Sequence, residues 1–294
     1  MQDIIWHSVK GGILKKLTIW LSALFLTLSF HSIASNIKQE KIADNLHILS
    51  GKEYGTNIGL ISTEEGVVII DPMPGERNLA ELDEIIKSTY DNSNTFILNT
   101  HKHADHTGGN EFFIKRGGTL IGSEFDFMGI KRVELKSHSS TDYVYYHEKS
   151  NVIFVGDVFD TSWHPTFYAG GLEGFDKAVN AILALGDKES LIVPGHGVPA
   201  YKPALKAFRE NTFKWVSIIQ ELHKEGQSVE SIMKKQRVKV ALEKFNVSKQ
   251  SPFIPENAFK RFVERTITVI EKEKDIFNAI VSLIKNAISE AKVR

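Results

Sequence analysis

The chain has no cysteine among its 294 residues, and this absence excludes disulfide bonds, thiolate metal ligands and catalysis by a cysteine nucleophile. Lys and Arg together number 36, as do Asp and Glu, so the formal net charge is zero. A chain without excess positive charge has no general attraction for nucleic acid. Any metal ion must therefore be held by histidine, aspartate or glutamate.

The start of the chain has the order of a secretory signal peptide. Lysines precede an apolar run at 17–30, and small residues follow at Ser32 and Ala34. The run is shorter than the roughly 20 apolar residues that span a membrane. We therefore expect cleavage after Ala34 and a periplasmic or secreted protein without stable membrane insertion. An uncleaved anchor is the alternative.

Apolar runs separated by glycine turns predict strands within residues 46–70, and a short buried strand is expected at 95–100. Helical spacing predicts helices at 78–90 and 175–185, and the pattern is helical from residue 202 onward. Strands interrupted by helices predict an α/β fold, a sandwich of sheets with helices outside. We expect three parts, namely a signal peptide at 1–34, an α/β domain at 35–200 and a helical C-terminal region at 201–294 that packs on it.

Three histidines and an aspartate follow the predicted strand at 95–100, in the sequence "HKHADH". Side chains two residues apart on an extended chain leave on the same face, so His101 and His103 can reach one ion together. Asp105 and His106 follow in a loop that can present them to a second ion. Imidazole and carboxylate ligands suit Zn²⁺, and also iron or manganese. The sequence therefore predicts a metal site here.

Five motifs in this order resemble the metallo-β-lactamase superfamily. They lie within residues 40–200 and read "VVIIDP", "THKHADHTGGN", "SHSSTDYVYY", "NVIFVGDVF" and "IVPGHG". The resemblance implies the αβ/βα four-layer sandwich of that family, with metals at one edge between two sheets. Within the family, the chain is most similar to a periplasmic, β-lactamase-like branch.

The resemblance also implies two metal sites that share one bridging carboxylate. The first site comprises His101, His103 and His138, the second comprises Asp105, His106 and His196, and the bridge is Asp157. Asp157 and His196 each follow an apolar run that predicts a buried strand, as a site at a common sheet edge requires. His138 departs from the family pattern, because it lacks the usual Gly-His-Thr frame.

Two zinc ions in such a site lower the pKa of a shared water molecule and supply a hydroxide at neutral pH. The predicted function is therefore metal-dependent hydrolysis, in which dinuclear zinc-bound hydroxide attacks an ester, thioester, lactone or amide carbonyl, β-lactams included. Asp105 is a candidate catalytic residue that orients the hydroxide, and His164 is a candidate proton donor. Thr100 and Asn99 are candidates for orienting the ligands.

Other functions fit the same residues. One alternative is an oxidoreductase similar to persulfide dioxygenases, which hold one iron on two histidines and an aspartate. Another is a glyoxalase II-like thioesterase, and a third is a metal-binding protein without turnover. In each enzyme reading the partner is a small-molecule substrate, and no nucleic-acid partner is expected. The oligomeric state cannot be derived from the sequence.

Overall fold

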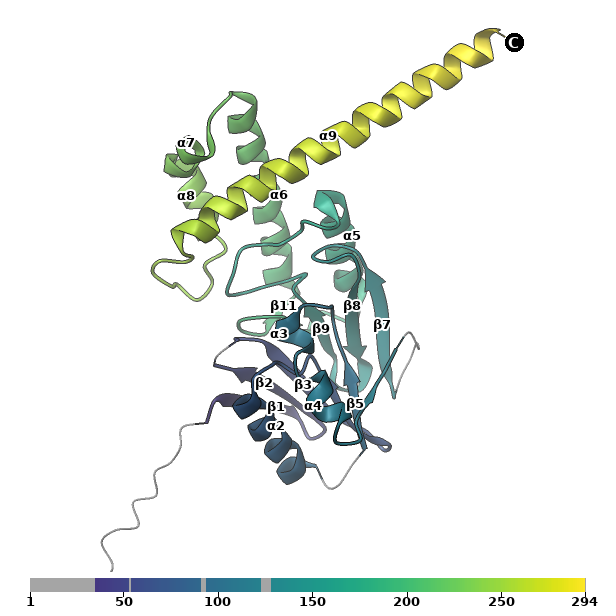
Figure 1. Ribbon diagram of the computed structural model, residues 1–294, viewed down its shortest axis with the longest axis vertical. Helices are drawn as coiled ribbons and strands as arrows, with labels where there is room; N and C mark the ends of the chain where they lie inside the picture. The colour runs from purple at the N-terminus through teal and green to yellow at the C-terminus, as the bar shows by residue number, and fades with distance from the viewer. Residues whose placement is uncertain (1–34, 53, 91–93, 123–127, 294) are drawn as a thin grey trace, which may run out of the picture. The chain divides into compact units, whose positions relative to one another are not determined.

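A computed structural model describes residues 35–293 except 53, 91–93 and 123–127, and its strands form two sheets (Figure 1). The first sheet has the order β1-β2-β3-β4-β5-β6, and its strands are β1 Ile37–Ala43, β2 Leu46–Gly51, β3 Asn57–Ser62, β4 Gly66–Ile70, β5 Asn94–Leu98 and β6 Thr119–Leu120. The second has the order β11-β10-β9-β8-β7, and its strands are β7 Ile130–Leu135, β8 Asp142–His147, β9 Val152–Gly156, β10 Leu191–Pro194 and β11 Ala200–Tyr201.

Buried apolar side chains hold the two sheets together. Ile48 and Val68 of the first sheet share one cluster with Tyr145 and Phe154 of the second. On its other face, the first sheet packs against α2, Glu76–Thr89, whose buried leucines join a second cluster. The apolar residues of α2 recur at helical spacing, so they form one stripe that faces the sheet.

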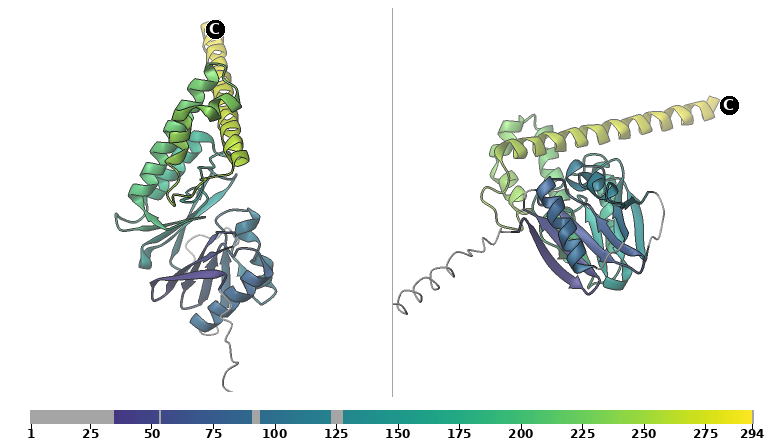
Figure 2. Two further views of the ribbon diagram at one scale, coloured as in Figure 1. Left: turned by 90° about the vertical axis from the view of Figure 1, so that its left-hand side faces the viewer. Right: turned by 60° about the horizontal axis from the view of Figure 1, so that its bottom comes forward.

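Helices α5 and α6 lie on the other face of the second sheet, and the later helices pack on them and on one another (Figure 2). These helices are α5 Gly171–Ala184, α6 Lys202–Lys224, α7 Val229–Lys234, α8 Gln236–Glu243 and α9 Glu256–Val293. A third apolar cluster joins Ile153 of β9 to Phe175 of α5, Trp215 of α6 and Phe262 of α9. The layers therefore run helix, sheet, sheet, helix, and the expected αβ/βα sandwich with C-terminal helices is confirmed.

The helical region begins where the sequence pattern predicts it, since α6 starts at Lys202. The ring of Trp215 stacks on Phe262 with centroids 4.2 Å apart, which ties α6 to α9. Residues 36–294 form one compact unit by their contacts, and the division at residue 200 stays a prediction. The predicted signal peptide lies outside the described residues. In the part of the chain that the structure describes, no helix is long and apolar enough to cross a membrane.

Two parallel strand pairs bring the predicted ligands to one edge of the sandwich. β4 runs parallel to β5 in the first sheet, and β9 runs parallel to β10 in the second. Asp71 follows β4, the loop 101–106 follows β5, Asp157 follows β9 and His196 follows β10. The carboxyl ends of parallel strands share an edge, which is where such sheets bind ligands.

Candidate metal centre

The ligand loop leaves β5 and turns into a short helix, α3, Ala104–Thr107. His101 and His103 precede this helix, and Asp105 and His106 lie on it. Gly109, which follows α3, has no room for a side chain because a Cβ there would lie 2.7 Å from the Pro72 carbonyl oxygen. The helix therefore packs closely under the site.

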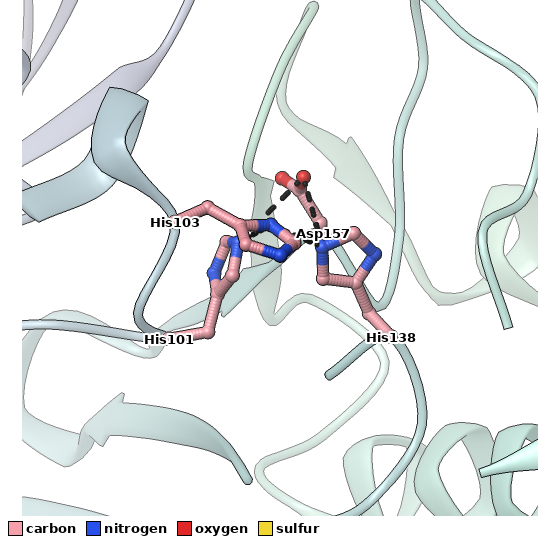
Figure 3. Close-up of side chains that lie close together, drawn as sticks. All are labelled: His101, His103, His138 and Asp157. Atoms are coloured by element: carbon pink, nitrogen blue, oxygen red, sulfur yellow. Dashed lines mark hydrogen bonds and ion pairs between the residues drawn. The ribbon is translucent and has the colours of Figure 1, made fainter. Parts of the chain in front are cut away.

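The first group of converging side chains comprises His101, His103, His138 and Asp157 (Figure 3). One ligand atom from each lies within 4.8 Å of the others. His101 Nε2 and His138 Nε2 are each 2.9 Å from His103 Nδ1. His138 comes from the loop between β7 and β8, so the two sheets both supply this group.

The second group comprises Asp105, His106 and His196, whose ligand atoms also lie within 4.8 Å of one another. Asp105 Oδ2 is 3.6 Å from His106 Nε2 and 3.2 Å from His196 Nε2. His106 is fully buried, whereas the Asp105 side chain is 35% exposed. The aspartate is thus the member of this group that solvent or a substrate can reach.

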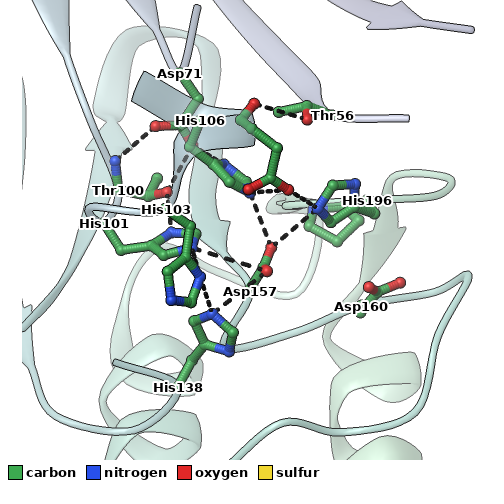
Figure 4. Close-up of polar contacts among 12 residues, drawn as sticks. Thr56, Asp71, Thr100, His101, His103, His106, His138, Asp157, Asp160 and His196 are labelled. Carbon is green, nitrogen blue, oxygen red and sulfur yellow. Dashed lines mark hydrogen bonds and ion pairs between the residues drawn. The ribbon is translucent and has the colours of Figure 1, made fainter. Parts of the chain in front are cut away.

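Asp157 lies between the two groups and directs one carboxylate oxygen at each (Figure 4). Its Oδ2 is 3.8 Å from His101 Nε2 and 3.5 Å from His138 Nε2. Its Oδ1 is 3.2 Å from His106 Nε2 and 3.5 Å from His196 Nε2. This is the position that a carboxylate bridging two ions must take.

The unpartnered atoms of the centre show that these residues fit metal ions. Within the described residues, the buried atoms His106 Nε2 and Asp157 Oδ1 make no hydrogen bond of good geometry, although they face each other at 3.2 Å. A buried polar atom without a hydrogen bond destabilises the folded state, so we expect an ion or a water molecule to contact these atoms. Seven imidazole and carboxylate groups without any thiolate match the donors that zinc, iron and manganese take.

The electrostatics of the centre follow from burial and from its carboxylates. Burial lowers the pKa of His101 to about 2, which keeps the ring neutral as a metal ligand must be. Burial also disfavours the charged form of His196, but the hydrogen bond to Asp105 and the charge of Asp157 outweigh it and raise its pKa to about 9. The hydrogen bond from His196 in turn lowers the pKa of Asp105 to about 2. The second group therefore attracts positive charge.

Asp71 orients the ligand loop, and sequence reasoning did not single out this residue. Its carboxylate is 2% exposed and accepts hydrogen bonds from Thr100 N at 2.7 Å, Thr100 Oγ1 at 2.6 Å and His106 Nδ1 at 2.9 Å. Since His106 Nδ1 carries the proton in that bond, its Nε2 is left to face the centre. The "IIDP" ending of β4 was a signal, because it places an acidic residue at a buried strand end.

Thr100 and Asn99 contact the ligand loop as the sequence predicts. Thr100 Oγ1 donates to Asp71 and lies 3.1 Å from His101 Nδ1, so it accepts the proton of that ring nitrogen. Asn99 Nδ2 donates to the carbonyl of His106 at 3.1 Å. These contacts leave His101 Nε2 free to face the centre.

His138 is oriented by a turn and by a threonine. Asp142 accepts hydrogen bonds from the backbone N–H of Ser137 and Ser139, on either side of His138. The His138 Nδ1 lies 2.5 Å from Thr166 Oγ1 and 3.2 Å from its carbonyl oxygen. This turn therefore replaces the Gly-His-Thr frame that the family uses, and His138 Nε2 points at the first group.

The start of β3 ties the ligand loops of the two sheets together. Asn57 Nδ2 donates to the carbonyls of Pro194 and Gly197, on both sides of His196. Thr56 Oγ1 donates to the carbonyl of Asp105 at 3.0 Å. Thr56 and Asn57 are two ordinary polar residues at the start of a strand, so their sequence does not indicate that they connect the two ligand loops.

A cavity of about 700 Å³ opens beside Asp157 and His196. Tyr54 from the β2–β3 loop and Trp163 from the β9–α5 loop line it. Asp160 lines it too, although only 8% of this residue is exposed. The cavity is large enough for a small-molecule substrate.

His164, the predicted proton donor, has a different place. Its buried ring stacks on Phe262 with centroids 4.0 Å apart, and its Nδ1 donates to the carbonyl of Pro165. It does not line the cavity, although its neighbour Trp163 does. Burial lowers its pKa to about 4. These contacts give His164 a packing role and do not support proton donation to a substrate.

Comparison with known proteins finds a family model that covers the ligand loop and several relatives. A family model, "Metallo-beta-lactamase superfamily", matches residues 51–124. The chain is 30% identical over 108 residues to metallo-beta-lactamase type 2 of Elizabethkingia meningoseptica, a match covering 33% of this chain and 43% of the relative. It is 25% identical over 218 residues to metallo-beta-lactamase IND-1 of Chryseobacterium indologenes, covering 60% of this chain and 88% of the relative.

A third relative is named as a different kind of hydrolase. The chain is 26% identical over 121 residues to the probable hydroxyacylglutathione hydrolase glo2 of Schizosaccharomyces pombe, covering 34% of this chain and 47% of the relative. The matches to this protein and to the type 2 enzyme therefore span less than half of either relative.

One solved structure shares the fold over most of the chain. A beta-lactamase domain protein from Burkholderia ambifaria superposes with a TM-score of 0.54 at 14% identity, covering 71% of this chain and 86% of that one. At this identity the likeness concerns the fold alone. The segment matched by the family model, residues 51–124, carries the ligand loop, so the chain is similar to the metallo-β-lactamase superfamily in this loop and shares a fold with the Burkholderia ambifaria domain over most of its length.

Proposed function

We propose that the protein is a metal-dependent hydrolase that holds two zinc ions and cleaves an ester, thioester, lactone or amide. The observation that carries this proposal is the place of Asp157, which directs one oxygen at each ligand group. A lone ion on the first group would leave the second group without a role. The paired arrangement therefore favours two ions over the single iron of the dioxygenase alternative.

When bound, two divalent ions supply Lewis acidity toward a substrate carbonyl and lower the pKa of a water molecule at the site. His101, His103 and His138 would hold the first ion, and Asp105, His106 and His196 the second, with Asp157 between them. Asp71 and Thr166 keep the proton of His106 and His138 on Nδ1, so that each Nε2 is available as a ligand.

Asp105 is the residue we propose to handle the proton of the attacking water. It is the exposed carboxylate of the second group, and Thr56 fixes its backbone. Its low pKa keeps it ionised at neutral pH. It can therefore accept a hydrogen bond from a water molecule and orient it toward the carbonyl carbon.

The substrate is proposed as a class only. The relatives named metallo-beta-lactamase and hydroxyacylglutathione hydrolase favour an acyl compound, a β-lactam or a thioester among them. The cavity with Tyr54 and Trp163 suits a substrate that carries an apolar or aromatic group beside the reacting carbonyl.

The first test is the metal content of the purified protein, measured without chelator or added metal. About two zinc ions per chain support the proposal, and one iron per chain together with oxygen consumption would overturn it. The second test is Asp157→Ala, which should lower both metal content and turnover by orders of magnitude on a panel of β-lactams, lactones and thioesters. Asp176→Ala is the matched control, since that aspartate pairs with Arg209 on the helical side. Unchanged turnover in Asp157→Ala would contradict the bridging role.

A further inference from the structure

Asp160 is a carboxylate close to the centre that belongs to neither ligand group. It lines the cavity together with Asp157 and His196. Figure 4 shows it on the His196 side of the centre, apart from the converging side chains and without a dashed line to Asp157 or His196. Within the described residues, its hydrogen bonds go only to Ser162. It therefore lies next to the proposed reaction site and is not one of the candidate metal ligands.

The two oxygens of Asp160 have different surroundings. Oδ1 accepts hydrogen bonds from Ser162 N at 2.6 Å and from Ser162 Oγ at 2.9 Å. No described residue donates to Oδ2, and yet Oδ2 is not among the fully buried atoms without a partner. The residue lines the cavity, so Oδ2 is the oxygen that has no donor from the described residues and is available to a substrate there.

The surroundings of the carboxyl group favour its protonated form. Burial raises the pKa of Asp160 to about 6, while the nearby His196 opposes this increase. Such a group can both hold a proton and release it near neutral pH, as a general acid must. On the cavity side of the centre, Asp160 thus has the proton affinity that a donor needs.

We infer that Asp160 is a catalytic residue that protonates the leaving group, and that the natural substrate carries a poor leaving group, an alcohol or an amine. The inference rests on the proposed hydrolase function. Thiols ionise near pH 8.5 and leave as thiolates without help, whereas alcohols and amines need a proton as the bond breaks. The inference therefore selects esters, lactones and amides within the proposed substrate class.

The proton balance of this step is complete. The oxygen of a water molecule bonds to the carbonyl carbon, and Asp105 accepts the proton that the water loses. The bond from that carbon to the leaving oxygen or nitrogen breaks, its electron pair stays on the leaving atom, and Asp160 gives this atom a proton. Asp105 then releases a proton to solvent and Asp160 takes one up. One water is consumed, and a carboxylic acid and an alcohol or amine are formed.

A purely structural role for Asp160 is the alternative, because the next residue, Thr161, holds the loop of His196. Thr161 donates from its backbone to the carbonyl of His196 and from its hydroxyl to that of Val198. A change at Asp160 that moved His196 would slow the cleavage of every substrate alike. A proton donor instead matters more as the leaving group becomes poorer.

The test compares leaving groups on one acyl group, using the zinc-loaded full chain. The two substrates are an alkyl ester and a nitrophenyl ester of the same acid. Asp160→Asn should lower kcat/KM for the alkyl ester about 10²- to 10⁴-fold. The loss for the nitrophenyl ester should be at least about tenfold smaller. Thr161→Val, which keeps the carboxyl group and loses only the hydroxyl contacts to the carbonyls of His196 and Val198, should change both esters by the same factor. Equal losses on both esters in Asp160→Asn would overturn the inference and leave the proposed function standing.

The unmodified chain provides a second test that does not depend on a variant folding. Across phenyl esters whose leaving groups have pKa values from about 7 to about 10, kcat/KM should vary by less than about threefold, because the donor compensates for the poorer leaving group. A fall of more than about thirtyfold would overturn the inference. Absence of hydrolysis of any ester, thioester, lactone or amide by the zinc-loaded chain would instead overturn the proposed function, and the inference with it.

Discussion

Asp71→Asn is the substitution that best separates orientation of the ligands from ligation itself. Asp71 lies outside both ligand groups but fixes the loop that carries most of them. Its backbone is left-handed, with φ at 57°. Asparagine tolerates this conformation almost as well as aspartate does, so the substitution tests the carboxylate without adding backbone strain.

The expected loss follows from the three hydrogen bonds that Asp71 accepts. Oδ2 accepts from Thr100 Oγ1 and His106 Nδ1, and Oδ1 accepts from Thr100 N. An asparagine keeps only one acceptor oxygen. If this oxygen takes the place of Oδ2, the NH₂ group faces the Thr100 N–H, and two donors then meet without an acceptor. A buried donor without a partner costs about 1–3 kcal/mol, so the free energy of unfolding should fall by about 2 kcal/mol. Loss of a group that orients a ligand lowers metal affinity about 10- to 100-fold.

Both quantities can be measured on the same protein. Urea unfolding in the presence of chelator gives the free energy of unfolding, and competition with a chromophoric chelator gives the zinc affinity. Asp44→Asn is the control, because the Asp44 side chain is fully exposed and pairs only with Lys41. A zinc affinity within about twofold of the unmodified chain would refute the orienting role of Asp71.

Three further changes test other parts of the structure. Burial holds the folded-state pKa of His164 at about 4, below its ordinary value of 6.5, so its stabilising contribution is present above pH 6.5 and is lost as the pH falls toward 4. Between pH 7 and pH 4.5 the free energy of unfolding should fall by about 2.5 kcal/mol for this reason, as measured by urea unfolding with chelator present. His164→Phe should lack this loss, and equal pH sensitivity of the two proteins would count against the prediction. Gly195→Ala places a Cβ against Asp157 Oδ1, so zinc content and turnover should fall together. Asp142→Ala frees the turn around His138, and elemental analysis should show loss of one ion before the other.

The sequence predicts the ligands well because they stand at strand ends. His101 and His103 follow from local periodicity, because they stand after a buried strand with one residue between them. Asp157 and His196 also stand at strand ends, but the resemblance to the family is what named them as ligands. Asp71 could not be assigned in the same way. Its partner Thr100 lies 29 residues later, and the two meet only through the register of β4 against β5.

The packing of His164 could not be derived from the sequence either. This residue stands seven residues after Asp157 in the sequence, among aromatic residues, which made it a candidate for the cavity. Its ring stacks instead on that of Phe262 in α9, almost one hundred residues later in the chain. A prediction from local sequence has no access to a packing partner at that separation.

Because each sheet supplies ligands, the proposed zinc ions would also hold the two halves of the sandwich together. The ligand loop belongs to the first sheet, whereas His138, Asp157 and His196 belong to the second. Ions that bind only the assembled edge stabilise it by mass action, by about 2.7 kcal/mol at a free concentration one hundred times the dissociation constant. Zinc supply would then govern how long the protein survives proteases as well as whether it is active, and a metal-starved population would be lost by degradation.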